Sequence, residues 1–365
     1  MYKNDDRQCN FNTKYNNELE KLPKIICDAN PDWVKMYYLA WETAFSNIEY
    51  PKKEGWLPQM TCMPDMGMIW QWDSCFMTFI SNYSNGTISA LNNLDNLYSV
   101  QREDGYLCMA YYIETGEPCY ESRINPPLLA WAEWQHFLIS GDNSRFERVL
   151  PSLVKYYNWI KANRRRNNGL YWFEDSGSSG MDNSPRGVYF STHLDGSDVS
   201  YIDLICQQAL SAYCISKIAA NIQNYEIERQ FIEEYKDLYT LINKHHWNEK
   251  TGFYYDLFTR HNKHLKNNYV NHKTVAGFWP IISGVADNYQ VNKLIEHLVN
   301  PDEFMTPHPV PTISKDDPNY NPLGGYWLGS VWAPTNYMIV KGLRQRKRYG
   351  LAREIAIKHL NAMML

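Results

Sequence analysis

The sequence predicts an all-α protein in which an inner ring of helices is wrapped by an outer ring. Apolar residues recur at helical spacing along most of the 365 residues, and no alternation of strand and helix indicates a parallel sheet. Long loops rich in Gly, Pro, Asn and Ser separate the expected helices. About eleven or twelve helices that alternate with such loops fit a toroid of paired helices. Because no linker divides the chain, we expect one domain over residues 1–365.

The clearest helical pattern lies where Phe231, Tyr235, Leu238 and Ile242 share one face between polar residues. Further helices are expected at 31–48, 70–81, 87–100, 126–140, 146–157, 202–214, 274–284, 288–299, 329–346 and 350–362. Short hairpins are expected at 169–173 and 252–256. The loops between helices cover 49–69, 101–125, 168–197, 247–273 and 301–328. Loops of this length in a compact protein are usually functional, so we expect the site residues there.

The charge balance argues against a nucleic-acid partner. Lys and Arg number 36 against 40 Asp and Glu, a net charge of -4, so no basic excess is available to neutralise a phosphate backbone. Two local basic runs, Arg164 to Arg166 and Arg344 to Arg348, are interpreted as solvated helix ends that complement the helix dipole.

The eight cysteines show neither a CxxC pair nor Cys/His spacing for zinc. Cys75, Cys206 and Cys214 fall in apolar helical patterns and are expected to be buried free thiols. No metal or cofactor is predicted. The N-terminus lacks a signal-type apolar stretch, and the longest apolar run is too short to span a bilayer. These features favour a cytoplasmic protein without a membrane partner, and a processed secreted form stays open.

Aromatic residues make up 15% of the chain, and rings serve both cores and flat binding surfaces. Three segments stand out by composition. Rings and polar groups meet in 68–76, with Trp70, Gln71, Trp72 and Asp73; glycines and polar groups meet in 177–186, with Asp182, Asn183 and Arg186; and rings and glycines meet in 324–337, with Tyr326, Trp327, Gly329 and Trp332. Indole stacks on sugar faces while carboxylates hold hydroxyls. Structural alternatives are an Asx turn with a salt bridge at 182–186 and a helix cap at Asp73.

Together these segments resemble the helical-toroid glycoside hydrolases: the mannosylglycerate-hydrolase-like domain, the processing α-glucosidases and the trehalases. The resemblance rests on W-x-W-D-S-x-F, G-M-D-N-S-P-R and Y-W-x-G-x-V-W-A-P-x-N-Y in this order. It implies an (α/α)6 barrel that cleaves α-linked glucosides or mannosides with inversion. Asp182 would be the general acid, and burial in the pocket would favour its protonated form.

The resemblance also implies the residues that bind or support the substrate. They are Trp70, Gln71, Trp72, Asp73, Asn125, Asn183, Arg186, Asp198, Tyr326, Trp327, Gly329 and Trp332. Asn125 stands where the family usually has Gln, and Leu328 where it often has Arg. Asn183, Arg186 and Asp198 are expected to support the acid and the pocket.

An inverting enzyme also needs a carboxylate base about 6.5 to 9.5 Å from the acid. In the resembling family this base is a Glu in an E-x-Y segment, and none follows Trp332 in this chain. We therefore expect the base and the last barrel helix beyond Leu365. Glu354 is interpreted as an i,i+4 pairing residue, and Glu103 and Asp104 as sugar-contact or turn residues. The alternative function is a catalytically impaired, carbohydrate-binding relative.

Overall fold

The computed structural model describes residues 14–89, 91–186, 198–259 and 268–364. Its α-helices are α1 (Asn16–Leu19), α2 (Pro31–Ser46), α3 (Gln71–Ser81), α4 (Asn92–Ser99), α5 (Leu129–Ser140), α6 (Phe146–Arg164), α7 (Ile202–Asn221), α8 (Tyr225–His245), α9 (Trp279–Ile282), α10 (Asn288–Leu298), α11 (Ala333–Gln345) and α12 (Tyr349–Ala362). Every helix longer than one turn falls on a range that the apolar spacing predicts.

Local signals set several helix ends. The side chain of Asn224 caps α8 by accepting from the backbone N–H of Ile227. Asp287 and Gln290 form a capping box at the start of α10. The helix expected at 274–284 is instead a 3-10 turn, Val275–Phe278, followed by the short α9. Gly277 fits tightly there, because a Cβ would lie 2.4 Å from the ring of Phe253.

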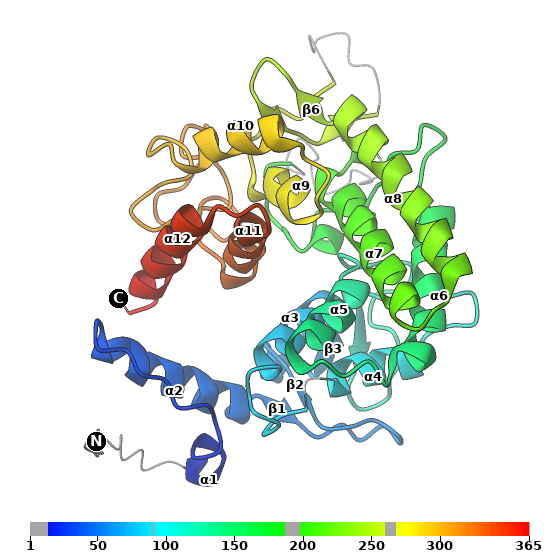
Figure 1. The fold of residues 1–365 in the computed structure, drawn as a ribbon, viewed down its shortest axis with the longest axis vertical. Helices are drawn as coiled ribbons and strands as arrows, with labels where there is room; N and C mark the ends of the chain where they lie inside the picture. The colour runs from blue at the N-terminus through cyan, green and yellow to red at the C-terminus, as the bar shows by residue number, and fades with distance from the viewer. Residues whose placement is uncertain (1–13, 90, 187–197, 260–267, 365) are drawn as a thin grey trace.

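The helices form two concentric rings (Figure 1). Helices α3, α5, α7, α9 and α11 lie inside, and each contacts the next in this order. Helices α2, α4, α6, α8, α10 and α12 lie outside them. Alternate helices along the chain therefore belong to alternate rings, which is the (α/α)6 architecture that the sequence predicts. The indole of Trp33 on α2 donates to Asn361 on α12 at 3.1 Å, so the first and last outer helices are in contact.

The strands are short and lie in four antiparallel pairs: β1 (Ile48–Glu49) with β2 (Gln59–Met60), β3 (Met68–Trp70) with β4 (Ala110–Tyr112), β5 (Val199–Ser200) with β8 (Leu257–Phe258), and β6 (Trp247–Asn248) with β7 (Phe253–Tyr254). The β6–β7 pair confirms the hairpin expected at 252–256. At 169–173 the structure has a tight turn with one antiparallel bridge, between Tyr171 and Arg165, and no strand longer than this bridge. Backbone bonds from Arg166 to Leu170 and from Trp172 to Arg164 flank the bridge, so the expected hairpin is reduced to its turn.

The core of the inner ring is aromatic. Phe79 of α3 packs against Trp131 of α5, with ring centroids 4.5 Å apart, and stacks on Tyr337 of α11 at 5.4 Å. Trp131 also contacts Trp279 of α9 at 6.3 Å. Rings from four inner helices thus meet around Trp131, which is 1% exposed.

Two predictions about individual residues are confirmed and one is wrong. Cys75, Cys206 and Cys214 are buried free thiols, and Arg344 lies exposed at the end of α11, both as expected. Arg164 is not a solvated helix end. It is buried, and its guanidinium binds the Glu174 carboxylate and the backbone carbonyl of Ser122.

No helix in the described ranges has both the length and the apolar character that crossing a membrane requires. In the same ranges, no three His, Cys, Asp or Glu side chains are grouped so that they could hold a metal ion.

We predict that replacing Trp131 with Ala lowers the free energy of unfolding by about 3–5 kcal/mol, because a cavity opens where four inner helices meet. Urea unfolding followed by circular dichroism measures this. Leu39→Ala on α2 is the control, since Leu39 is 61% exposed. A loss below about 1 kcal/mol for Trp131→Ala would contradict the packing.

Candidate functional site

The structure brings the three predicted site segments together near the starts of inner helices. Residues 70–73 open α3, residues 324–332 lead into α11, and the loop 177–186 lies between them. Three contacts join the segments. The hydroxyl of Tyr326 donates to a carboxylate oxygen of Asp182, the Trp72 and Trp327 rings lie 6.2 Å apart, and Gly180 packs on Trp72.

Asp73 is the half-buried carboxylate of this site, in the first turn of α3. The Cys62 thiol donates to its Oδ1 at 3.1 Å. Burial raises the pKa of Asp73, and the neighbouring Asp182 acts in the same direction, while the Cys62 hydrogen bond opposes both. Burial and the proximity of Asp73 raise the pKa of the Cys62 thiol as well, so it remains a donor. An ionised Asp73 therefore offers acceptor oxygens at a cost in stability.

Asp182 is exposed in the free protein, unlike the buried acid that the sequence analysis expects. The Tyr326 hydroxyl donates to Oδ2 of Asp182, and burial together with Asp182 raises the pKa of Tyr326 to about 12. Tyr326 therefore stays a neutral donor that fixes the orientation of the carboxyl group. The backbone carbonyl of Asp182 is held by the Ser176 hydroxyl at 2.7 Å.

A glycine is required in the loop next to Asp182. Gly180 has φ +76°, and a Cβ there would lie 2.6 Å from the Trp72 ring. The glycine lets the loop lie directly on the indole, so Trp72 and Asp182 belong to one surface.

Asn183 joins the two loops of the site. Its Oδ1 accepts from the backbone N–H of Trp327 at 2.8 Å, and its Nδ2 donates to the carbonyl of Gly325 at 3.1 Å. These bonds straddle Tyr326, whose φ is +66°. The Asn183 side chain thus fixes the segment that presents the Tyr326 hydroxyl to Asp182.

Arg186 anchors the loop to the interior. Its side chain is 0% exposed and makes paired hydrogen bonds to Asp203, at 2.6 and 2.7 Å, and to Asp256, at 2.7 Å each. Burial lowers the pKa of Arg186, but Asp203 and Asp256 outweigh it and raise this pKa above its usual value. Asp203 lies in the first turn of α7 and Asp256 precedes β8. The arginine is a support and is turned away from solvent.

The rings differ in exposure. Trp327 is 3% exposed, and it stacks on Trp332 with centroids 5.1 Å apart and planes 9° apart. Tyr326 is 46% exposed, and Trp332, which is half-buried, donates its indole N–H to the Tyr326 carbonyl at 3.3 Å. The accessible ring surface therefore belongs to Tyr326 and Trp332, and Trp327 packs behind them. Gly329, with φ +144°, donates its N–H to the Thr312 hydroxyl and shapes this turn.

The four other predicted site residues make the following contacts. The buried Gln71 accepts from Tyr156 at 2.8 Å, and the half-buried Trp70 packs on Tyr120. Asn125 is 3% exposed and links the N–H of Trp72 to the carbonyl of Ser178, over longer distances of 3.5 and 3.4 Å. The backbone carbonyl of Asp198 accepts from the N–H and the hydroxyl of Thr259.

Two carboxylates flank Asp182, and both have partners. Asp73 is bound by Cys62. Asp175 pairs with Arg123 at 2.7 Å and accepts from the N–H of Ser178. A Cβ on Gly177 would lie 3.3 Å from Oδ1 of Asp175 and 3.6 Å from Oδ1 of Asp182, so both carboxylates lie next to that glycine.

Two of the acidic residues weighed in the sequence analysis have structural partners elsewhere. Glu354 pairs with Lys358 at 2.9 Å, which confirms the i,i+4 interpretation. Asp104 binds Arg102 and accepts from the N–H of Tyr106, so it is a turn residue.

Sequence reasoning missed Cys62, Thr312, Asp203 and Asp256. Each contacts a predicted site residue through tertiary structure, from a segment without a recognisable motif. A lone Cys, Thr or Asp carries no sequence signal of such a contact.

Comparison with known proteins identifies this arrangement. The model for the mannosylglycerate hydrolase MGH1-like glycoside hydrolase domain matches residues 67–364. An uncharacterized protein of Borreliella burgdorferi is 33% identical over 80% of this chain and 58% of its own length. The mannosylglycerate hydrolase of Thermus thermophilus is 25% identical over 51% of this chain and 41% of its own length. The chain thus spans about half the length of these curated relatives.

The fold comparison agrees. The crystal structure of the GH63 mannosylglycerate hydrolase from Thermus thermophilus in complex with glucose superposes with a TM-score of 0.69, at 20% identity, covering 89% of this chain and 91% of that one. Neutral trehalase from Saccharomyces cerevisiae superposes with a TM-score of 0.67 at 15% identity, covering 94% of this chain and 82% of the trehalase chain. These likenesses show the (α/α)6 fold.

We predict that Asp73→Asn raises the melting temperature of the free protein at pH 7. The folded-state pKa of Asp73 lies above its unfolded value, so its ionised form lowers stability at neutral pH. This penalty disappears as the pH falls below the raised pKa, and the difference between the proteins should shrink there. Calorimetry from pH 7 to pH 4 measures it, with the 83% exposed Asp302→Asn as control. A lower melting temperature for Asp73→Asn at pH 7 would refute the prediction.

We predict that Arg186→Gln lowers the free energy of unfolding by about 3–5 kcal/mol, because it leaves two buried carboxylates without their cation. Urea denaturation measures the loss. Arg148→Gln is the matched control, since Arg148 is 59% exposed and pairs at the surface with Asp95. Equal effects of the two changes would show that the buried cluster does not hold the loop.

Proposed function

Because the chain belongs to the family of mannosylglycerate hydrolase MGH1-like glycoside hydrolase domains, we propose that it hydrolyses α-linked glucosides or mannosides with inversion. The observation that carries this proposal is the contact of three segments around Asp182. Tyr326 donates to its carboxyl group, and Asp73 lies near enough for Asp182 to add to the rise in the pKa of Asp73 that burial causes. Rings and carboxylates on one surface are what sugar recognition requires.

In the proposed reaction Asp182 is the general acid. It protonates the glycosidic oxygen as the bond to the anomeric carbon breaks, and the aglycone leaves as an alcohol. A water adds to the anomeric carbon from the opposite face and gives its proton to a second carboxylate, the base. Its exposure in the free protein allows it to exchange its proton with water between turnovers.

Asp73 and the rings hold the sugar. An ionised Asp73 accepts hydrogen bonds from two adjacent hydroxyls, which recovers the cost of burying its charge. Tyr326 and Trp332 present the exposed ring surface on which a pyranose face stacks. Arg186 and Asn183 act by positioning the acid loop, through Asp203 and Gly325 respectively.

A carbohydrate-binding relative without turnover is the second candidate. It is favoured by the partners of the two carboxylates beside Asp182, because Asp73 is held by Cys62 and Asp175 by Arg123. With Asp73 holding sugar hydroxyls and Asp175 paired with Arg123, neither of these two carboxylates is assigned to activate a water on the opposite sugar face.

We predict that Asp182→Asn reduces turnover at least about 10³-fold, because no proton reaches the leaving oxygen. Proton NMR with α-mannosylglycerate and α-linked glucose disaccharides measures both the rate and the anomer released first. The β-anomer is expected. Asp302→Asn, an exposed carboxylate, is the matched control and should keep full activity.

The two candidates separate in the same experiment. Sugar-dependent quenching of tryptophan fluorescence without turnover supports the binding relative. The α-anomer as first product refutes inversion, and turnover that survives Asp182→Asn refutes the assignment of the acid. Neither turnover nor any fluorescence response would refute both candidates.

A further inference from the structure

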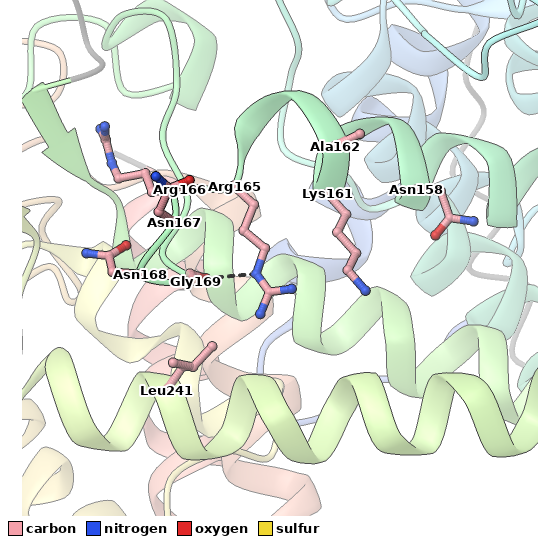
Figure 2. Close-up of a pocket in the computed structure, with 9 residues that line it drawn as sticks. All are labelled: Asn158, Lys161, Ala162, Arg165, Arg166, Asn167, Asn168, Gly169 and Leu241. Carbon is pink, nitrogen blue, oxygen red and sulfur yellow. Dashed lines mark hydrogen bonds between the residues drawn. The ribbon is translucent and has the colours of Figure 1, made fainter.

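A pocket of about 630 Å³ lies outside the candidate sugar site, between the end of α6, the turn that follows it and α8 (Figure 2). Its cationic side chains are Lys161, Arg165 and Arg166, and three asparagines surround them: Asn158, Asn167 and Asn168. Leu241 of α8 closes the apolar side. No residue of this lining belongs to the candidate sugar site.

The lining carries positive charge in a protein whose net charge is -4. None of the nine lining residues is acidic. Lys161 pairs with Glu234 of α8, and Arg166 donates to the Ser200 hydroxyl and the Val199 carbonyl. Arg165 is different: its Nε donates to the Gly169 carbonyl at 3.3 Å, and no carboxylate of the described residues is paired with it.

The pocket is held in shape by its backbone. The turn closes through two hydrogen bonds, from the N–H of Gly169 to Arg166 at 2.9 Å and from the N–H of Arg166 to Leu170 at 2.8 Å. Gly169 has φ +86°, and a Cβ there would lie 2.8 Å from Leu241. Arg164 on the inner side is bound to Glu174. Binding a ligand would therefore order the turn very little further, which keeps the entropy cost small.

We propose that this pocket binds a small phosphate monoester that also carries hydroxyls. The guanidinium of Arg165 has N–H groups that suit two phosphate oxygens. Lys161, in the last turn of α6, adds a second cation to the lining (Figure 2). The asparagine amides provide donors and acceptors for hydroxyl groups. A volume of about 630 Å³ suits a small metabolite and exceeds what a bare ion needs.

Isothermal titration calorimetry with glucose 6-phosphate tests the proposal, with inorganic phosphate, adenosine monophosphate and sodium sulfate at matched ionic strength. We expect saturable binding of a phosphate monoester, tighter than that of phosphate or sulfate by at least tenfold. Comparing glucose 6-phosphate with adenosine monophosphate shows whether the pocket prefers a sugar phosphate or a nucleotide. Asp73→Asn should bind it as the unchanged protein does, which separates this pocket from the sugar site.

Arg165→Gln should weaken the binding at least tenfold, and the matched change Arg353→Gln, at an exposed position on α12, should leave it unchanged. Asn167→Asp is the second variant, because Asn167 is exposed in the turn and a new carboxylate would repel the phosphate without disturbing the fold. Asn163→Asp, an exposed α6 position outside the lining, is its control. Equal binding of sulfate and the monoesters, or full affinity in Asn167→Asp, would overturn the proposal.

Discussion

The buried cluster of Arg186 with Asp203 and Asp256 is the interaction on which the candidate site depends. One guanidinium with 0% exposure is shared by two carboxylates, one at the start of α7 and one before β8. Desolvating these charges is costly, and only complete pairing offsets the cost. This pairing therefore fixes the position of Arg186 at the end of the loop. The loop residues between Asp182 and Arg186 are held in place relative to it.

From this anchor the loop reaches the other two segments by short-range contacts. Asn183 bonds the backbone on both sides of Tyr326, and Tyr326 in turn bonds Asp182. Gly180 lies against Trp72. A long loop without regular structure thereby gains the order that catalysis or selective sugar binding requires. The inner ring supplies the rigid base, because Phe79, Trp131 and Tyr337 join its helices near the centre.

The two carboxylates of the site have opposite environments in the free protein. Asp73 is half-buried with a raised pKa, whereas Asp182 is exposed. In the proposed reaction this division suits Asp73 to holding hydroxyls and Asp182 to giving up a proton. The consequence is lower stability around Asp73, as is common where a site needs a buried charge. A second, basic pocket on the outer ring lies apart from this chemistry.

The sequence by itself determined the helices, because the spacing of apolar residues follows the local 3.6-residue period of a helix. This spacing can be recognised within one segment, without knowing which other segments pack against it. It also determined the three site segments, because rings, glycines and carboxylates cluster in the chain. Only the tertiary structure decided how individual residues are used. Arg164 is a buried ion pair instead of a solvated end, Trp327 packs behind Trp332, and Cys62 bonds Asp73. Each of these depends on contacts between segments far apart in the chain, and burial and pairing at such contacts leave no periodic trace in the sequence.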